Sequence, residues 1–420
     1  MNTLKFLNSA SIQADSLSAD LPALRARLFA NGICWTDDAK GQFDANTPFR
    51  VILYTRHGKI DFKNPMVKEC NGLVFEYNNG WHLRAMPQNA FCTNKISMKK
   101  LNDLHSANNY DVYEVLDATI LTLYYYNGQW CVSSTKGYDI GSTEMVQGMS
   151  YIEAIQDLMD TKYKSFQFED LTKTYSYTIA LRHSKYHIFD ETKHLANRTK
   201  NVPRAGVDMN SYIMVMSVAD TTTGTNVSKH VPGLPQQNPV ALKELNIYTL
   251  VGYARSAYAK YAKAYRLQNF KYKPLYGYIL RAKNSAVPDD YSTIYLESEL
   301  YRTIKIGLYK DNRDLITMDY DHLVVQMSMN HERYEQFRIM FQQFESKFQQ
   351  LEDVINSVAA EVTHRIVSSS EDSEITNISS NDFIQDLAEQ FKSESNITPG
   401  IVKDAMYSKQ HLANLFELLK

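Results

Sequence analysis

The 420-residue sequence predicts an α+β protein in which an antiparallel, two-sheet domain is followed by an all-helical C-terminal domain. Two runs rich in β-branched and aromatic residues each contain an Asn-Gly turn, at Asn79-Gly80 and Asn127-Gly128. Asn-Gly between such runs is the strongest short signal for an antiparallel hairpin. Apolar residues at helical spacing then dominate the last quarter of the chain. We therefore expect domains at residues 1–310 and 311–420.

The first domain is expected to open with a short helix and then to consist mainly of strands. The helix covers Leu21–Ala30, with Asp20 as its N-cap and Asn31-Gly32 as its end. A strand follows at Phe49–Tyr54, and then the hairpin that contains Asn79-Gly80. Residues 96–109 indicate a short polar helix before the central hairpin.

The central hairpin lies within Tyr110–Gly141, where two β-rich runs flank Asn127-Gly128. An amphipathic helix is expected over Ser150–Met159. Strand composition returns at Tyr175–Phe189 and at Ser211–Ala219.

The C-terminal domain is expected to be helical throughout. His331–Ser368 has the spacing of one long helix with a single apolar face. A polar linker follows, and then amphipathic helices over Asn381–Lys392 and Ile401–Leu419. Thr398-Pro399 is a typical start for the last of these, because proline is favoured at the first helical position.

Three short segments of the strand-rich region carry a resemblance to a known family. The first reads Glu69-Cys-Asn-Gly-Leu-Val-Phe75, the second Val115-Leu-Asp-Ala-Thr119 and the third Thr135-Lys-Gly137. In this order they resemble the Glu-Cys-Arg-Gly, Lys-x-Asp-Gly-Ser and Ser-Lys-Gly motifs of phage RNA ligases of the tRNA-repair type, in the nucleotidyltransferase superfamily. The resemblance spans roughly residues 45–305. The alternative is an unrelated α+β protein that shares hairpins by chance.

The resemblance implies a fold without the activity. Val115 stands where the family has the lysine that accepts AMP, and valine has no lone pair for attack on a phosphate. Asn71 stands at the family's arginine. The family's nucleotide-binding glutamate, metal-associated glutamate and paired phosphate-binding lysines fall on Thr178, Tyr276, Tyr295 and Glu297. We therefore expect a pseudoenzyme with no catalytic residue, no metal site and no cofactor, in which Lys136 is kept.

A second informative stretch, Leu245–Pro288, contains no Asp or Glu. Its cations are interleaved with tyrosines, and the part over residues 253–268 predicts a helix. Lys and Arg contact phosphates and tyrosine rings stack on bases, which is the composition that binding of single-stranded RNA or DNA requires. The expected RNA-binding residues here are Arg255, Tyr258, Lys260, Tyr261, Lys263, Tyr265, Arg266, Lys271, Tyr272 and Lys273. The alternative is a helix whose tyrosines pack on the core and whose lysines are merely solvated.

A basic run at 183–204 adds Arg198, Lys200 and Arg204 to this expected RNA surface, and Lys136 is included in it. The run is either a loop that closes over RNA or an ordinary exposed loop. Its histidines, His183, His187 and His194, lack the Cys or Asp companions of a metal site. The four cysteines are spaced singly and are expected to be free thiols.

Charge is distributed unevenly along the chain. Residues 311–420 carry 9 Lys/Arg and 19 Asp/Glu, which leaves residues 1–310 with 36 and 28 of the totals of 45 and 47. The basic part is the candidate for a polyanionic partner, and the acidic helical part for a protein partner. No run approaches the ~18 apolar residues of a membrane helix, and the N-terminus lacks the apolar core of a signal peptide. We expect a protein of the host-cell cytoplasm, encoded by a phage, with no membrane partner.

Three functions remain open at this point. The first is a catalytically inactive, ligase-like protein that binds or protects RNA. The second is a divergent active ligase that uses a relocated lysine, such as Lys136, Lys95 or Lys99. The third is a structural or interaction protein whose old nucleotide cleft is filled by tyrosines.

Overall fold

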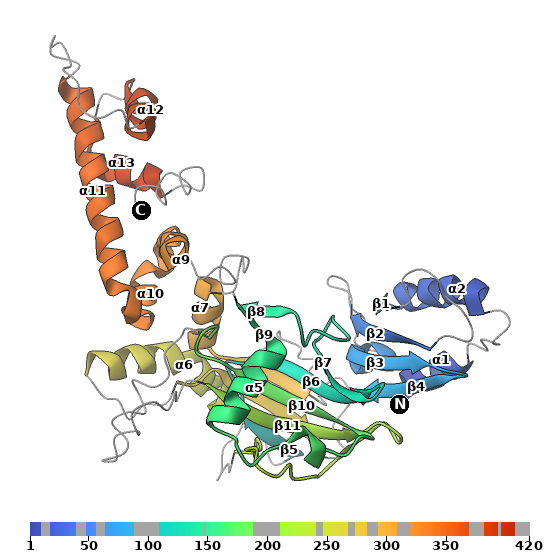
Figure 1. The fold of residues 1–420 in the computed structure, drawn as a ribbon. Helices are drawn as coiled ribbons and strands as arrows, with labels where there is room; N and C mark the ends of the chain where they lie inside the picture. Colours follow the sequence, from blue (N-terminus) through green and yellow to red (C-terminus); the bar gives the residue numbers. More distant parts are fainter. Residues whose placement is uncertain are drawn as a thin grey trace. The chain divides into compact units, whose positions relative to one another are not determined.

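The computed structural model describes residues 1–9, 17–38, 48–55, 64–87, 109–146, 148–187, 211–240, 247–267, 274–283, 293–308, 320–368, 382–393 and 396–407. The chain divides into two compact units, Met1–Tyr301 and Arg302–Lys420 (Figure 1). The first unit contains the sheets and the second is helical in its described part. The division lies after residue 301, whereas the sequence places it after residue 310.

A four-stranded antiparallel sheet begins the first unit, in the order β1-β2-β3-β4. Its strands are β1 (Ile33–Asp37), β2 (Phe49–Thr55), β3 (Asn71–Tyr77) and β4 (Trp81–Ala85). Three helices pack with it: α1 (Asn2–Ser9), α2 (Leu17–Ala30) and α3 (Pro65–Glu69). The core between them is aromatic at one end, where the rings of Trp35 and Trp81 meet edge to face at 5.7 Å.

A five-stranded antiparallel sheet follows, in the order β12-β11-β10-β6-β7. Its strands are β6 (Thr119–Tyr126), β7 (Gln129–Ser133), β10 (Tyr175–Arg182), β11 (Tyr212–Asp220) and β12 (Thr225–Val227). Helix α5 (Tyr151–Thr161) buries its apolar face against this sheet (Figure 1). Ser150 caps α5 in a capping box with Glu153, which satisfies two backbone N–H groups at the helix start.

Two further small sheets complete the first unit. β5 (Tyr110–Glu114), β13 (Gly277–Ala282) and β14 (Thr293–Glu297) form an antiparallel sheet with β13 in the centre. Ile247 and Leu250 of α6 (Ile247–Arg266) pack in the core of that sheet. β8 (Glu144–Val146) and β9 (Met149–Ser150) pair beside α5.

The Asn-Gly turns have the backbone that their sequences predict. Asn127 and Gly128 connect β6 to β7 with φ of 48° and 87°, the left-handed values of a type I′ hairpin turn. Asn79, between β3 and β4, also has a positive φ, of 52°. Both predicted hairpins are therefore confirmed.

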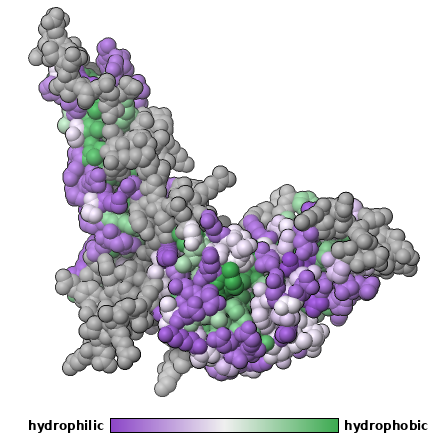
Figure 2. Space-filling view, viewed as in Figure 1, coloured by the Kyte–Doolittle hydropathy of each residue, from purple (hydrophilic) through white to green (hydrophobic). Residues whose placement is uncertain are grey.

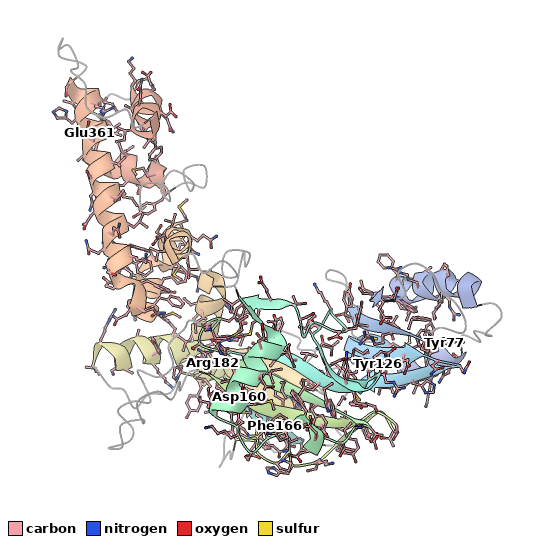
Figure 3. The ribbon with its side chains drawn as sticks, viewed as in Figure 1. Tyr77, Tyr126, Asp160, Phe166, Arg182 and Glu361 are labelled. Atoms are coloured by element: carbon pink, nitrogen blue, oxygen red, sulfur yellow. The ribbon has the colours of Figure 1, made fainter. Side chains whose placement is uncertain are left out.

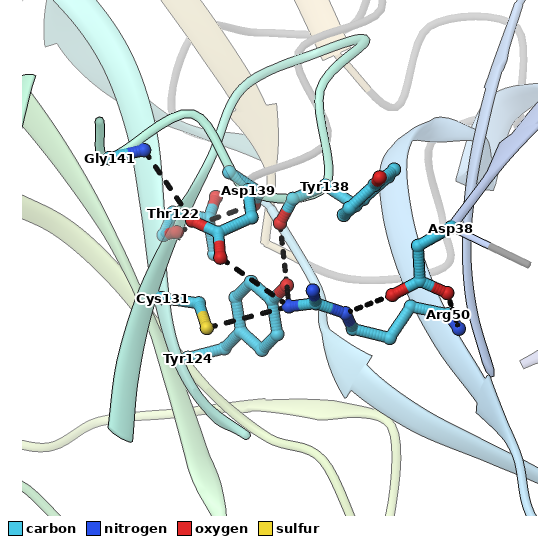
Figure 4. A network of polar contacts seen from close by, with 9 residues as sticks. Asp38, Arg50, Thr122, Tyr124, Cys131, Tyr138, Asp139 and Gly141 are labelled. Carbon is cyan, nitrogen blue, oxygen red and sulfur yellow. Dashed lines mark hydrogen bonds and ion pairs between the residues drawn. The ribbon is translucent and has the colours of Figure 1, made fainter. Parts of the chain in front are cut away.

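Arg50 of β2 joins the four-stranded sheet to the β6–β7 hairpin (Figure 4). Its guanidinium donates to Asp38 at 2.8 Å and to the hydroxyl of Tyr124 at 3.1 Å. It also lies 4.3 Å from the ring centroid of Tyr126, close enough for a cation–π contact. Around it, Ile52 of β2 and Cys131 of β7 share one apolar cluster.

The second unit is built around α11 (Glu345–Ser368), whose buried face includes Leu351, Ile355 and Val358. The shorter helices are α7 (Glu299–Leu308), which begins in the first unit, α9 (Tyr320–Ser328), α10 (Tyr334–Met340), α12 (Asp382–Phe391) and α13 (Pro399–Met406). α9, α12 and α13 contact α11. Thr398 caps α13, as predicted.

The α+β class with antiparallel sheets and a helical C-terminal region is confirmed. Three details differ from the sequence-based prediction. The expected pair of sheets is divided further, because the chain leaves β5 at Glu114 and enters a different sheet at Thr119. α2 begins at Leu17, so Asp20 lies inside the helix and is not its cap. The helix expected over residues 96–109 lies outside the described residues.

The long helix expected over His331–Ser368 is broken around Phe341, whose φ and ψ are −116° and 50°. α10 ends there and α11 starts at Glu345. The break buries the Phe341 side chain completely and lets Arg338 pair with Glu345 and Glu352 of α11. Burial of this aromatic side chain and the ion pairs of Arg338 stabilise the break, and the periodic apolar pattern does not reveal either of them.

No helix among the described residues is both long and apolar enough to cross a membrane. Hydrophilic residues cover much of the visible face of the described residues in both units (Figure 2).

Two glycines with nearly the same backbone conformation give a matched test of the sheet geometry. Gly277 and Gly80 have φ of 139° and 144°. A Cβ on Gly277 would lie 2.1 Å from the carbonyl oxygen of Leu296, whereas one on Gly80 would have nothing within 4 Å. We predict that Gly277→Ala lowers the free energy of unfolding by about 2 kcal/mol more than Gly80→Ala does, because β13 and β14 must separate. Urea unfolding of both variants measures this difference, and equal losses would contradict it.

Candidate functional site

The position expected for a nucleophilic lysine lies just after β5. Val115 is buried there, 7% exposed, and its backbone N–H donates to the carbonyl of Gly277 at 3.0 Å. The side chain is therefore held in the core beside β13. An aliphatic side chain at this point can pack but cannot attack a phosphate.

Two residues further on, Asp117 forms a buried ion pair with Arg182, the last residue of β10. The Asp117 Oδ2 and Arg182 Nη1 atoms are 2.5 Å apart, and the side chains are 1% and 0% exposed. Nη1 of Arg182 also donates to the backbone carbonyl of Asp117 at 2.7 Å, and Nη2 to the carbonyl of His187 at 3.4 Å. The charges of the two groups are thus directed at each other and at backbone oxygens.

Tyr301 lies close enough to this ion pair for both of its charges to act on the tyrosine hydroxyl. Tyr276 is 6% exposed, and its ring centroid is 5.3 Å from that of Tyr301. Burial raises the pKa of the Tyr301 hydroxyl, and the nearby charges of Asp117 and Glu297 raise it further. Thr178, where the resemblance placed the family's nucleotide-binding glutamate, is completely buried in β10. The structure therefore gathers Asp117, Tyr276 and Glu297 around Tyr301, in surroundings that favour uncharged side chains.

His187 is the second buried titratable group of this region. Its Nδ1 accepts from the backbone N–H of His183 at 3.2 Å, and its Nε2 lies 3.5 Å from the hydroxyl of Thr119. Burial lowers the pKa of His187 to about 3, with the positive charge of Arg182 as a further cause. The imidazole is therefore neutral at physiological pH, with its proton on Nε2.

The structure also brings together the first and third of the motifs that carry the family resemblance. A Cβ on Gly72, at the start of β3, would lie 2.8 Å from the carbonyl oxygen of Ser134. The turn that follows Ser134 exposes the side chain of Lys136. Asn71 and Lys136 thus flank one close approach of two backbones, which only glycine permits.

Glu69, the first residue of the Glu-Cys motif, has a structural role. Its carboxylate accepts from the backbone N–H groups of Asn2 and Thr3, each at 2.8 Å, and from the Thr3 hydroxyl at 2.7 Å. A carboxylate at a helix N-terminus satisfies free N–H groups and interacts favourably with the helix dipole. Glu69, the last residue of α3, therefore attaches α1 to α3, just before β3 begins.

The expected RNA-binding residues of α6 fall on different faces of the helix. Arg255, Lys260, Lys263 and Arg266 are exposed, and at about 100° per residue they occupy an arc of about 140°. Tyr258 is half-buried. Tyr261 is 3% exposed and packs on the inner side, so its ring offers no face to a base.

The remaining expected RNA-binding residues cannot be placed. Only the backbone of Tyr265 is described, within α6. Lys271, Tyr272, Lys273, Arg198, Lys200 and Arg204 lie outside the described residues. The described residues contain no group of three or more His, Cys, Asp or Glu that could hold a metal ion.

Sequence patterns did not identify Arg182, His187 or Arg50 as centres of polar networks. Arg182 follows the apolar run Ile179-Ala-Leu181, and a charge in such a strand signals either an edge position or a buried pair. Its partner is 65 residues away, which no local pattern reveals.

No model of a known protein family matches the chain. Sequence comparison finds relatives in African swine fever virus that are named "Putative RNA-ligase". One from a tick isolate is 23% identical over 331 residues, which cover 74% of this chain and 70% of the relative. A second, from the Badajoz strain, is 22% identical over the same share of both chains. The source of these relatives is not a bacteriophage, so a phage origin of the chain stays a prediction.

Solved structures of an archaeal ATP-dependent RNA ligase are also similar to the chain. One crystal form has a TM-score of 0.39 at 13% identity, over 83% of each chain. Another has a TM-score of 0.38 at 11% identity, over 82% of this chain and 83% of that one.

The depressed pKa of His187 predicts a pH dependence of stability. The unfolded chain binds a proton at His187 as the pH falls through about 6.5, whereas the folded protein does so only near 3. Stability is therefore lost below pH 6.5, by about 1.5 kcal/mol from this group between pH 6.5 and 5. We predict that His187→Gln removes that part of the slope in urea unfolding.

The exposed His82 provides the control, because its Nε2 lies 3.0 Å from the backbone carbonyl of Asn78 and its ring is accessible to solvent. His82→Gln should keep the slope of the parent. A His187→Gln variant with the parent's slope would show that His187 takes up its proton in the folded protein.

Proposed function

We propose that the chain is a non-catalytic RNA-binding protein on an RNA-ligase-like scaffold. The observation that carries the proposal is the residue found at the position expected for the nucleophile. Val115 is buried there, beside the closed Asp117–Arg182 ion pair. The relatives named as RNA ligases support an origin of the scaffold in that class of enzyme.

The charged side chains that a ligase directs at phosphates and metal ions are absent together with the nucleophile. Phosphoryl and nucleotidyl transfer depend on cations and carboxylates that are aimed at phosphate oxygens and metal ions. The positions that would carry them hold Thr178, Tyr276, Tyr295 and Glu297. Arg182, a buried cation of this region, directs its N–H groups at Asp117 and at the carbonyl of His187.

RNA binding is proposed for the exposed cations of α6. Four of them share one face of a 20-residue helix that contains no acidic residue. Phosphate contacts of this kind track a nucleic-acid backbone without reading its sequence. Tyr258, which is half-buried, lies beside this face, and Tyr253 is 38% exposed with the Lys260 ammonium 4.4 Å from its ring centroid, so both rings adjoin the cations and can stack on a base.

One observation favours a second candidate, an active ligase. Lys136 is exposed in the turn that contacts Gly72, and the resemblance places it among the conserved groups of the ligases. A lysine in this turn would need the missing metal and phosphate groups to be supplied by other residues. The experiment below separates the two candidates.

We predict that the protein forms no covalent adduct with AMP. The purified chain is incubated with labelled ATP and magnesium or manganese and is then denatured before detection of the label. Val115→Lys should also stay unlabelled, because the charged groups around the phosphates are still absent. Label on the parent that disappears in Lys136→Ala would establish the second candidate and overturn the proposal.

We predict that replacement of Lys260, Lys263 and Arg266 by alanine weakens the binding of single-stranded RNA of any sequence. Each phosphate contact that is lost should reduce the slope of log affinity against log salt by about 0.7, so the triple variant should lose about 2. Filter binding or fluorescence anisotropy between low and physiological salt measures the slope.

A second triple variant removes the same charge elsewhere, with alanine at the exposed Lys164, Lys173 and Lys229. This control should keep the parent's slope. Equal slopes in the parent and the α6 variant, with circular dichroism showing both to be folded, would mean that α6 is only a solvated helix.

A further inference from the structure

A pocket of about 370 Å³ opens beside the tips of the two Asn-Gly hairpins. One wall comes from the β3–β4 hairpin, through Glu76, Asn78 and Arg84, and the other from the β6–β7 hairpin, through Tyr125, Tyr126 and Asn127. Its volume is in the range of small-molecule sites, and its described lining combines aromatic rings with a few polar groups.

Glu76 gives this pocket a charged acceptor that is only partly used. The side chain is buried, and both contacts from Arg84, through Nε at 2.6 Å and through Nη2, go to the Oε2 atom. Among the described residues, the Oε1 atom has no hydrogen-bond partner. A carboxylate can only accept hydrogen bonds, so the group that completes this site must present N–H or O–H donors.

The other groups of the lining fit a planar ring. Tyr125 and Tyr126 provide aromatic surface at the end of β6, and Asn78 and Asn127 provide amides at the two hairpin tips. Arg50 lies against the Tyr126 ring, 4.3 Å from its centroid, which fixes the position of that ring. Burial raises the pKa of the Tyr126 hydroxyl, and the negative charge of Glu76 raises it further. This is consistent with the closeness of the two groups.

The pocket is separate from the Val115 region. β6 runs from Thr119, close to the buried ion pair, to Tyr126, beside the pocket. At about 3.3 Å per residue these ends are roughly 23 Å apart. Figure 3 shows Arg182 and Tyr126 well apart in the first unit.

We propose that this pocket binds a guanine base, with the Oε1 atom of Glu76 accepting from the N1–H and N2–H groups of the base. Guanine presents two neighbouring donors on its Watson–Crick edge, whereas the corresponding edges of adenine, cytosine and uracil each present only one donor beside one or two acceptors. Bases splayed from single strands are recognised by such hydrogen bonds together with aromatic stacking. A free guanine nucleotide offers the same chemistry. Binding of a guanine that belongs to an RNA strand rests on the proposed RNA-binding function, whereas binding of a free guanine nucleotide does not.

Glu76→Gln is the informative variant. The N–H groups of Arg84 require an acceptor, so the amide oxygen of Gln should face Arg84 and the amide NH₂ should face the pocket. The pocket then holds an N–H donor in place of the Oε1 acceptor, and this donor cannot form a hydrogen bond with the N–H groups of guanine. Glu361 of α11 is a matched control, because it pairs with the Nε of Arg365 at 2.8 Å outside the pocket.

The first arm of the experiment titrates GMP, AMP, CMP and UMP into the full chain by isothermal calorimetry. GMP should bind about tenfold more tightly than the others, and Glu76→Gln should remove that preference, while Glu361→Gln should keep it. Asn127→Gly keeps the positive φ of the turn and removes the amide from the pocket. This variant should weaken the affinity for GMP about threefold. It provides a test of the pocket if Glu76→Gln does not fold.

The second arm compares an oligouridine with the same oligomer containing one guanosine. The parent should prefer the guanosine-containing strand, and Glu76→Gln should bind both equally. The α6 triple variant should bind both more weakly and keep the ratio. GMP binding that depends on Glu76, without RNA binding at any salt, would support the pocket and overturn the RNA-binding function.

Three results would overturn the pocket itself. They are equal affinity of the parent for GMP and AMP, no binding of GMP at millimolar concentration, and a folded Glu76→Gln variant that keeps the preference for GMP.

Discussion

The buried ion pair between Asp117 and Arg182 is the interaction on which the centre of the first unit depends. It fixes the connection between β5 and β6, where the chain changes sheets, to the end of β10. Burial of two charges costs several kcal/mol each, and the cost is offset only when every donor and acceptor is well placed. The backbone carbonyls of Asp117 and His187 accept further hydrogen bonds from Nη1 and Nη2 of Arg182, and the neutral His187 avoids a second positive charge beside it. The charges of the pair therefore act together with burial on the pKa values of the side chains around it, His187 and Tyr301.

In the proposed function, this arrangement accounts for the residues that stand at the ligase-like positions. A nucleotidyltransferase site must keep cations free to meet phosphates, whereas the site here pairs its arginine with its own aspartate. Tyr276 and Tyr301 fill the neighbouring space with rings, and the burial that raises the pKa of Tyr301 also disfavours any unpaired charge. In the proposed function the scaffold is kept for binding, and the surfaces that can contact RNA are α6 and the tips of the two hairpins.

The residue types at the turns and at the helix cap were sufficient to predict the hairpins and the start of α13. Asn127-Gly128 adopts the left-handed backbone that its residue types favour, and Thr398 caps α13. Sequence reasoning placed Tyr261 on the RNA face, although Ile247, Leu250, Ala254, Ala257 and Tyr261 share the three- and four-residue spacing of a buried stripe. That stripe indicates that Tyr261 lies on the buried side of α6. The break at Phe341 and the Asp117–Arg182 pair depend on contacts between distant residues, which spacing along the chain does not encode.

The most direct test of the account is a double-mutant cycle on Asp117→Leu and Arg182→Met, measured by urea unfolding and RNA binding. Each single variant leaves one buried charge without its partner and should lose about 3–5 kcal/mol of stability, whereas the double variant removes both charges and should regain most of it. RNA affinity of the double variant should equal that of the parent, because the pair has only a structural role. A double variant that recovers its stability but no longer binds RNA would show that these charges contact the ligand, and would contradict the account.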